Sequence, residues 1–142
     1  MYKLNDEFFT DHSDNRYIFV NQESGLFYGL SSSGSMILTW MLAGSNIDDV
    51  TEALLKIPFC PTDIKERINT MVNDLLDVKI ILKTDNQANE VPEIDLSDNY
   101  TQIELQDDRF NTDLVVSDDI EQLLLNDPVH EVSEGGWVPN MG

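Results

Sequence analysis

Basic residues are scarce in this 142-residue chain, in which 8 Lys and Arg stand against 27 Asp and Glu and give a formal net charge of −19. Proteins that bind phosphate backbones or anionic membranes rely on clustered Lys and Arg, so this balance argues against nucleic acid and against a membrane surface as partners. The sequence also lacks an apolar run of about 18 residues, and its start lacks the basic and apolar regions of a signal peptide. We therefore expect a cytoplasmic protein.

The residue types that carry catalysis and metal binding are sparse as well. Cys60 is the single cysteine, and with His12 and His130 it gives no zinc-ligand spacing. No glycine-rich phosphate loop, nucleophile elbow or His-Glu-x-x-His motif is present. Adjacent acidic residues do not share a helix face, so we interpret three pairs as solvated surface: Asp48/Asp49, Asp107/Asp108 and Asp118/Asp119. We predict a protein that is not an enzyme and that uses no cofactor and no metal ion.

The acidic residues that are present are distributed unevenly. Residues 1–83 hold 7 basic and 12 acidic side chains, whereas residues 84–142 hold 1 basic and 15 acidic ones. This change favours three parts: a domain over residues 1–83, an acidic linker over residues 84–108 and a tail over residues 109–142.

Within the domain, strand-like alternation gives way to helical spacing at Ser32. Two apolar runs, residues 17–20 and 26–30, flank turn residues and predict a hairpin with a third strand before it. The expected helices run from an N-cap at Ser32 or Ser33 to Gly44, from Ile47, capped by Asn46 or Ser45, to about Leu55, and from residues 61–63 to Leu76. Residues 78–82 either return as a last strand or close the core. We thus predict an α+β, winged-helix-like domain with a three-stranded antiparallel sheet followed by three helices.

Short apolar runs also occur beyond the domain. Residues 84–99 contain few large apolar side chains, and residues 100–105 alternate weakly. The stretch RFNTDLVVSDD, residues 109–119, holds strand-forming residues inside an acidic tail, and residues 117–125 suit a short capped helix.

The stretch GLFYGLSSSGSMILTWMLAGSNIDDVTEALL, together with the long helix and the Ile80-Ile81-Leu82 run that follow, resembles the PqqD-like family. These are the RiPP recognition elements, which bind leader peptides of ribosomally made natural products. The shared pattern is a strand ending in Leu30, a helix start at Ser33-Gly34 and a break at Gly44, and it covers most of residues 1–83. Leu38 and Lys79 depart from it, since family members often have Trp and Gly at these positions.

The resemblance implies a binding groove. In the proteins that this chain resembles, the leader adds as a strand to the exposed hairpin strand and lies against the third helix. Carried over to this sequence, the groove comprises Leu26, Phe27, Tyr28, Gly29, Leu30, Lys65, Ile68, Asn69 and Val72. An edge strand suits this role because an extended peptide can complete its unpaired N–H and C=O groups. The implied partners are a leader peptide, in cis or in trans, and a RiPP-modifying enzyme of the radical-SAM or ATP-using kind.

The tail itself resembles such a leader. RFNTDLVVS is similar to the Phe-Asn-Leu-Asp box of class I lanthipeptide leaders, with Thr112 as the departure. The leader-like positions are Phe110, Asn111, Asp113, Leu114, Val115 and Val116. Gly135 and Gly136 stand where a double-glycine cleavage site would fall. The peptide after them has no Cys, Ser or Thr, which leaves Trp137 and Asn140 as acceptors of an oxidative crosslink.

Three hypotheses about function follow from these observations. The first is a non-catalytic peptide chaperone that binds a precursor by strand addition and presents it to a modifying enzyme, with its own tail bound in cis or as a precursor fusion. The second is a winged-helix DNA-binding regulator, against which the acidic neighbours of Lys65 and Arg67 argue. The third is a PqqD-like domain with a merely solubilising acidic tail. For a tail bound in cis, we expect Phe110, Leu114 and Val116 to enter pockets.

Overall fold

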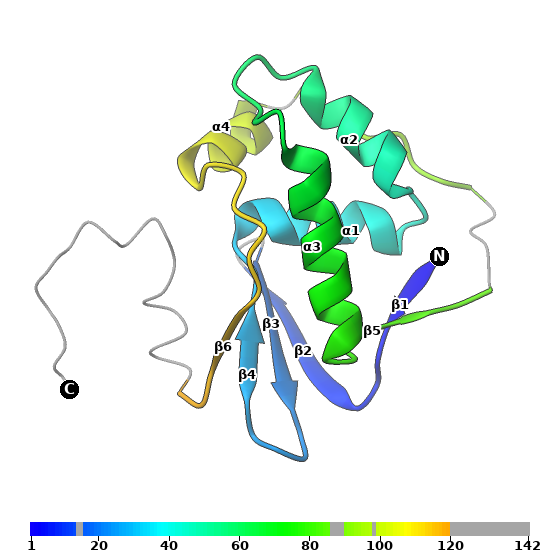
Figure 1. The fold of residues 1–142 in the computed structure, drawn as a ribbon, viewed down its shortest axis with the longest axis vertical. Helices are drawn as coiled ribbons and strands as arrows, with labels where there is room; N and C mark the ends of the chain where they lie inside the picture. The colour runs from blue at the N-terminus through cyan, green and yellow to red at the C-terminus, as the bar shows by residue number, and fades with distance from the viewer. Residues whose placement is uncertain (14–15, 86–89, 98, 120–142) are drawn as a thin grey trace, which may run out of the picture.

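The computed structural model describes residues 1–13, 16–85, 90–97 and 99–119 (Figure 1). Within these residues the chain adopts an α+β fold of four helices and antiparallel sheets. The strands are β1 (Tyr2–Leu4), β2 (Phe8–Ser13), β3 (Arg16–Asn21), β4 (Phe27–Gly29), β5 (Ile81–Lys83) and β6 (Val115–Ser117). The helices are α1 (Ser32–Leu42), α2 (Ile47–Leu55), α3 (Ile64–Asp77) and α4 (Asn99–Asp107).

The strands form two sheets rather than the single three-stranded sheet expected from the sequence. The larger sheet has the order β2-β3-β4-β6, and its β3–β4 hairpin closes through a turn in which Gly25 adopts a φ of +78°. Only glycine adopts such a conformation without a steric cost. The first strand of the chain, β1, pairs instead with β5. The predicted hairpin is therefore confirmed, while the tail contributes a strand that joins this sheet.

The first three helices begin and end close to the positions that the sequence predicted. The side chain of Ser31 caps α1, one residue before the predicted Ser32 or Ser33, and Asn46 caps α2 by accepting a hydrogen bond from the Asp49 N–H at 2.8 Å. The predicted apolar stripe of α3 is buried, and it comprises Ile64, Ile68, Met71, Val72 and Leu75.

The core lies between the helices and the larger sheet, and it includes residues from the segment predicted as a linker. Residues 84–108 contain α4, and its Leu105 is fully buried in the cluster formed by side chains such as Phe19, Leu30 and Ile37. The linker prediction is therefore wrong for this part of the chain, because the weak alternation of residues 100–105 belongs to a helix. No helix among the described residues is long and apolar enough to cross a membrane.

Candidate functional site

Strand β6 belongs to the acidic tail and pairs antiparallel with β4 at the edge of the larger sheet (Figure 1). The register places Val115 opposite Gly29, and Val116 opposite Tyr28. On its other side β4 pairs with β3. The tail thus occupies the strand edge to which the sequence analysis assigned a peptide ligand.

Phe110 fixes the tail to the core before the strand begins. Its side chain is 1% exposed, and its ring lies 5.8 Å from the ring of Phe59, centroid to centroid, in the segment between α2 and α3. Burial of an aromatic side chain of this size stabilises a structure by about 1.5–3 kcal/mol. Phe110 is therefore a principal apolar anchor of the tail.

A tight turn at the end of α4 places Phe110 in this position. The Phe110 N–H donates to the carbonyl of Leu105 at 3.0 Å, and the Arg109 N–H donates to that of Gln106 at 3.0 Å. Arg109 and Phe110 have φ angles of +57° and +56°. A non-glycine residue in this left-handed region costs roughly 1–2 kcal/mol, so the contacts of the tail must offset this strain.

Asp108, which directly precedes Arg109 and is counted with the tail from here on, joins the tail to the N-terminus of α1. Its carboxyl accepts hydrogen bonds from the Ser33 N–H, at 2.7 Å, and from the Ser33 hydroxyl. The side chain is 3% exposed, and burial raises the pKa of this carboxyl although the hydrogen bonds from Ser33 oppose the shift. The first turn of α1 has no acidic residue of its own, and Asp108 supplies one from the tail. The interpretation of Asp108 as solvated surface is wrong.

Further hydrogen bonds attach the turn at residues 109–112 to the start of α1 and to α3. The Arg67 guanidinium donates to the carbonyl of Arg109 at 3.2 Å, and the Thr112 hydroxyl donates to the carbonyl of Arg67 at 3.2 Å. The Ser31 hydroxyl donates to the carbonyl of Asn111. No pattern in the sequence predicted these partners. The run of serines at the start of α1 was their one visible signal, since it places several hydroxyl groups at a helix N-terminus.

The structure distributes the predicted groove residues among three settings. Phe27, Tyr28 and Gly29 form the strand that pairs with β6. Leu30, Ile68 and Val72 are buried in the core. Leu26 is partly buried, whereas Lys65 and Asn69 are exposed, and Lys65 forms an ion pair with Asp48 at 2.9 Å.

The leader-like residues also differ in their environments. Leu114 packs partly against the core, and the Asn111 side chain accepts a hydrogen bond from the exposed Asp113 at its N–H. Val116 shares a sheet face with Tyr28 but is 53% exposed, so the expectation that it enters a pocket is wrong. Its strand lies at the open edge of the sheet. The predicted cleavage and modification residues, Gly135, Gly136, Trp137 and Asn140, lie outside the described residues, as does most of the helix predicted over 117–125.

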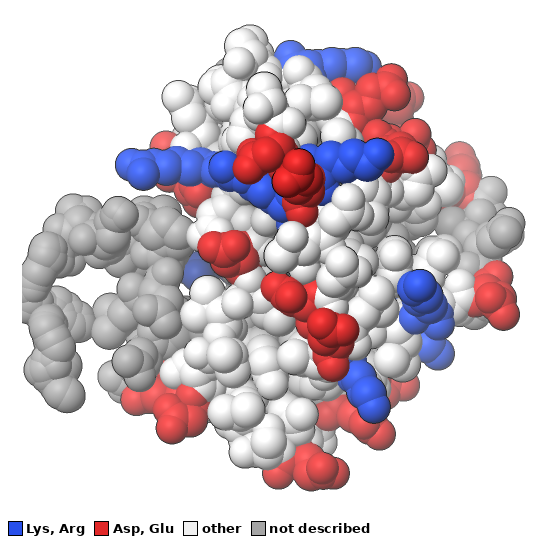
Figure 2. All heavy atoms as spheres, viewed as in Figure 1, with Lys and Arg blue, Asp and Glu red and all other residues white. Residues whose placement is uncertain are grey.

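The face on which α3 lies carries charges of both signs. Figure 2 shows Lys and Arg side chains beside Asp and Glu on this face, among many uncharged residues. Both basic side chains of α3 form ion pairs, Lys65 with Asp48 and Arg67 with Asp63, the latter pair at 3.0 Å. Such pairing reduces the positive potential with which a recognition helix attracts phosphate groups.

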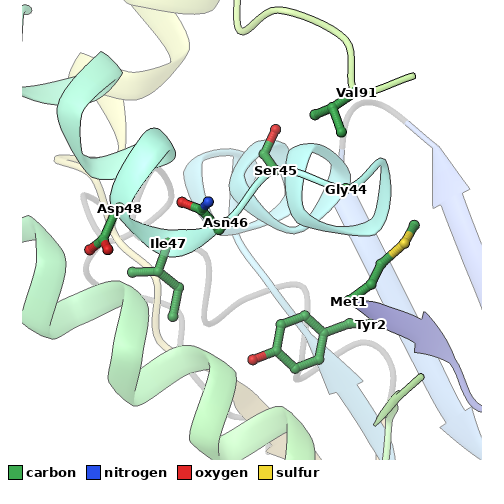
Figure 3. Close-up of a pocket in the computed structure, with 8 residues that line it drawn as sticks. All are labelled: Met1, Tyr2, Gly44, Ser45, Asn46, Ile47, Asp48 and Val91. Carbon is green, nitrogen blue, oxygen red and sulfur yellow. The ribbon is translucent and has the colours of Figure 1, made fainter. Parts of the chain in front are cut away.

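A separate cavity of about 480 Å³ lies beside β1 and the loop between α1 and α2 (Figure 3). Its lining comprises Met1, Tyr2, Gly44, Ser45, Asn46, Ile47, Asp48 and Val91. The Asn46 side chain already caps α2, and the Asp48 carboxylate pairs with Lys65. These two side chains thus have structural roles, and the tail-binding region is the stronger candidate site.

No protein-family model matches this chain, and neither a curated protein nor a solved structure shows significant similarity to it.

Proposed function

We propose that this chain is a non-catalytic peptide-binding module of the winged-helix-like, PqqD-like type, and that residues 108–117 are its leader-like ligand, carried in cis. In this account residues 1–83 form the binding domain and residues 109–142 the leader and precursor part. The partner is a RiPP-modifying enzyme in the cytoplasm, of the radical-SAM or ATP-using kind, to which the module presents the precursor.

The pairing of β6 with β4 is the observation that carries this proposal. A strand added to a sheet edge binds through main-chain hydrogen bonds, and side chains beside it supply specificity. The tail combines such a strand, Val115–Ser117, with a buried aromatic anchor at Phe110. A tail whose role was only to add charge would not need either feature.

The proposal is tested by removing the apolar anchors of the tail in the full chain. The test variant is Phe110→Ala/Leu114→Ala, and the control is Ile103→Ala/Val116→Ala, whose two side chains are more than half exposed in the same segment. We expect the test variant, but not the control, to show faster amide exchange in β4. We also expect it to bind an added fluorescent peptide of residues 99–119 in an anisotropy titration.

Two results would contradict the proposal. If the test variant exchanges and binds peptide as the control does, the tail is not a built-in ligand, and the reading of a solubilising tail stands. If the test variant loses the entire fold, the segment is a part of the domain rather than its ligand.

The DNA-binding alternative makes a different prediction. A winged-helix regulator would use Lys65 and Arg67 against phosphate groups, so its affinity for DNA would fall steeply with salt. The ion pairs with Asp48 and Asp63 argue against this use. Salt-dependent binding of duplex DNA by the intact chain would favour the regulator over the peptide-binding module.

A further inference from the structure

Within residues 108–119, the described part of the tail, the side-chain contacts are concentrated in the turn that precedes the strand. Three side chains of this turn are almost fully buried: Asp108, Phe110 and Thr112, at 3%, 1% and 4% exposure. In the strand itself, Val116 is more than half exposed and Val115 is only partly buried. The turn therefore presents more side-chain surface to the domain than the strand does.

Each buried side chain of the turn meets a different part of the domain. Asp108 accepts hydrogen bonds from Ser33 in α1, and Phe110 packs against Phe59 in the segment before α3. Thr112 donates to the carbonyl of Arg67 in α3 at 3.2 Å. A peptide that fills all three places must combine a short polar acceptor, an aromatic ring and a hydroxyl at alternate positions.

The chemistry of each place restricts what it accepts. At position 108, an Asn amide oxygen can replace the carboxyl oxygen that accepts from the Ser33 N–H, and its NH₂ group can donate to the Ser33 hydroxyl. An apolar residue there would leave the Ser33 N–H buried without this partner. At position 112, Val keeps the shape of Thr but loses the hydroxyl donor.

We infer that the domain selects its peptide ligand by a buried turn of the pattern Asp/Asn-x-Phe-x-Thr, residues 108–112, and that the added strand contributes affinity with little sequence preference. This inference rests on the proposed function, because it assumes that the segment is an exchangeable ligand. It assigns specificity to the turn that the N-terminus of α1 recognises, and not to the strand residues.

The test uses the full chain, folded first and then cut. A protease recognition sequence is inserted at Pro92, where residues 91–93 are exposed and have no regular secondary structure, and the folded protein is cleaved there. A fluorescent peptide of residues 93–119 is exchanged into the cut protein in urea just below its unfolding transition. Unlabelled peptides then compete with it, each carrying one substitution.

We expect the turn substitutions to be costly for competition. Asp108→Leu and Phe110→Ala should each raise the concentration needed for half-displacement by about tenfold or more, and Thr112→Val should raise it by about fivefold. Asp108→Asn, and the strand substitutions Val115→Thr and Val116→Thr, should change it by less than about threefold.

The outcomes separate the inference from the proposed function. If the parent peptide exchanges but the strand substitutions weaken it more than the turn substitutions, or all variants compete equally, the inference is overturned and the proposed function stands. If the parent peptide does not exchange into the cut protein at all, the segment is not a ligand, and both are overturned.

Discussion

The Asp108 carboxyl accepts a hydrogen bond from the backbone N–H of Ser33 at 2.7 Å, across 75 residues of sequence. This bond joins the tail to the first turn of α1, and it makes the docking of the tail sensitive to the protonation state of one buried carboxyl.

The pH dependence of stability follows from this carboxyl. Burial raises the pKa of Asp108 above its ordinary value of 3.8 in the folded chain. The folded state therefore binds the proton more tightly than the unfolded state. The stability that this proton contributes is complete below pH 3.8 and is lost as pH rises through the raised pKa. The variant Asp108→Asn has no such titration. Urea denaturation gives the unfolding free energy of the parent and of Asp108→Asn at each pH. We expect the parent value minus the Asp108→Asn value to fall as pH rises. A difference that stays constant with pH would contradict the prediction.

Phe110 is expected to dominate the apolar contribution of the tail. Replacing Phe110 by Ala removes a ring from a fully buried site next to Phe59, which should cost about 3–5 kcal/mol of unfolding free energy. The matched control is Ile103→Ala on α4, since Ile103 is 54% exposed, and it should change stability by less than about 0.5 kcal/mol. Equal unfolding free energies for the two variants would show that Phe110 does not anchor the tail to the domain.

Arg67 bonds to residues 109 and 112 of the tail, whereas the predicted groove residue Lys65 pairs with Asp48. The variant Arg67→Ala loses the hydrogen bond to the Arg109 carbonyl and should weaken tail docking by about 0.5–1.5 kcal/mol. Lys65→Ala loses an exposed ion pair with Asp48, worth at most about 1 kcal/mol, and leaves both hydrogen bonds between Arg67 and the tail in place. Amide exchange at Ser33 distinguishes the two variants, and it should accelerate only for Arg67→Ala. Equal acceleration would indicate a general loss of stability.

The left-handed turn predicts a stabilising substitution. Arg109 has a φ of +57°, which glycine adopts without the steric cost that an L-residue meets. Arg109→Gly keeps the carbonyl that accepts from Arg67, so it should stabilise the chain by about 0.5–1 kcal/mol. Arg109→Val is the counterpart and should destabilise it, because a β-branched residue fits this conformation poorly. Thermal unfolding midpoints in the reverse order would contradict the assigned backbone conformation.

The parts of the fold that the sequence predicted are those governed by local chemistry. The cap at Asn46 and the apolar spacing from Ile64 to Leu75 specify α2 and α3 without reference to the rest of the chain. Pairing between distant segments leaves no such local signal. The pairing of β1 with β5 and the bond from Ser33 to Asp108 depend on residues about 75 or more positions apart.

The candidate site was predictable to a similar extent. The strand-forming residues of the tail and of β4 are visible in the local sequence. The residues that bind the buried turn, such as Ser33 and Arg67, are not. The sequence predicts solvated surface for Asp108 because adjacent acidic residues do not share a helix face, and only the fold brings it to the serines of α1. Val116 alternates in step with Phe110 and Leu114, which predicted a buried side chain. It is exposed because β6 is the edge strand of the sheet.

The central claim is that the tail leaves and rejoins an otherwise folded domain, and native-state hydrogen exchange at two amides tests it most directly. The Ser33 N–H is bonded to Asp108 of the tail, whereas the Leu30 N–H is bonded to the Tyr17 carbonyl within the domain. For an intermolecular Kd of about 1 μM and an effective concentration of about 1 mM, undocking costs about 4 kcal/mol. We predict that Ser33 exchanges with about this opening free energy and with little dependence on urea, while Leu30 exchanges with the higher free energy and steep urea dependence of global unfolding. Identical opening free energies and identical urea slopes at Ser33 and Leu30 would show that the tail unfolds only with the domain, and would contradict the account.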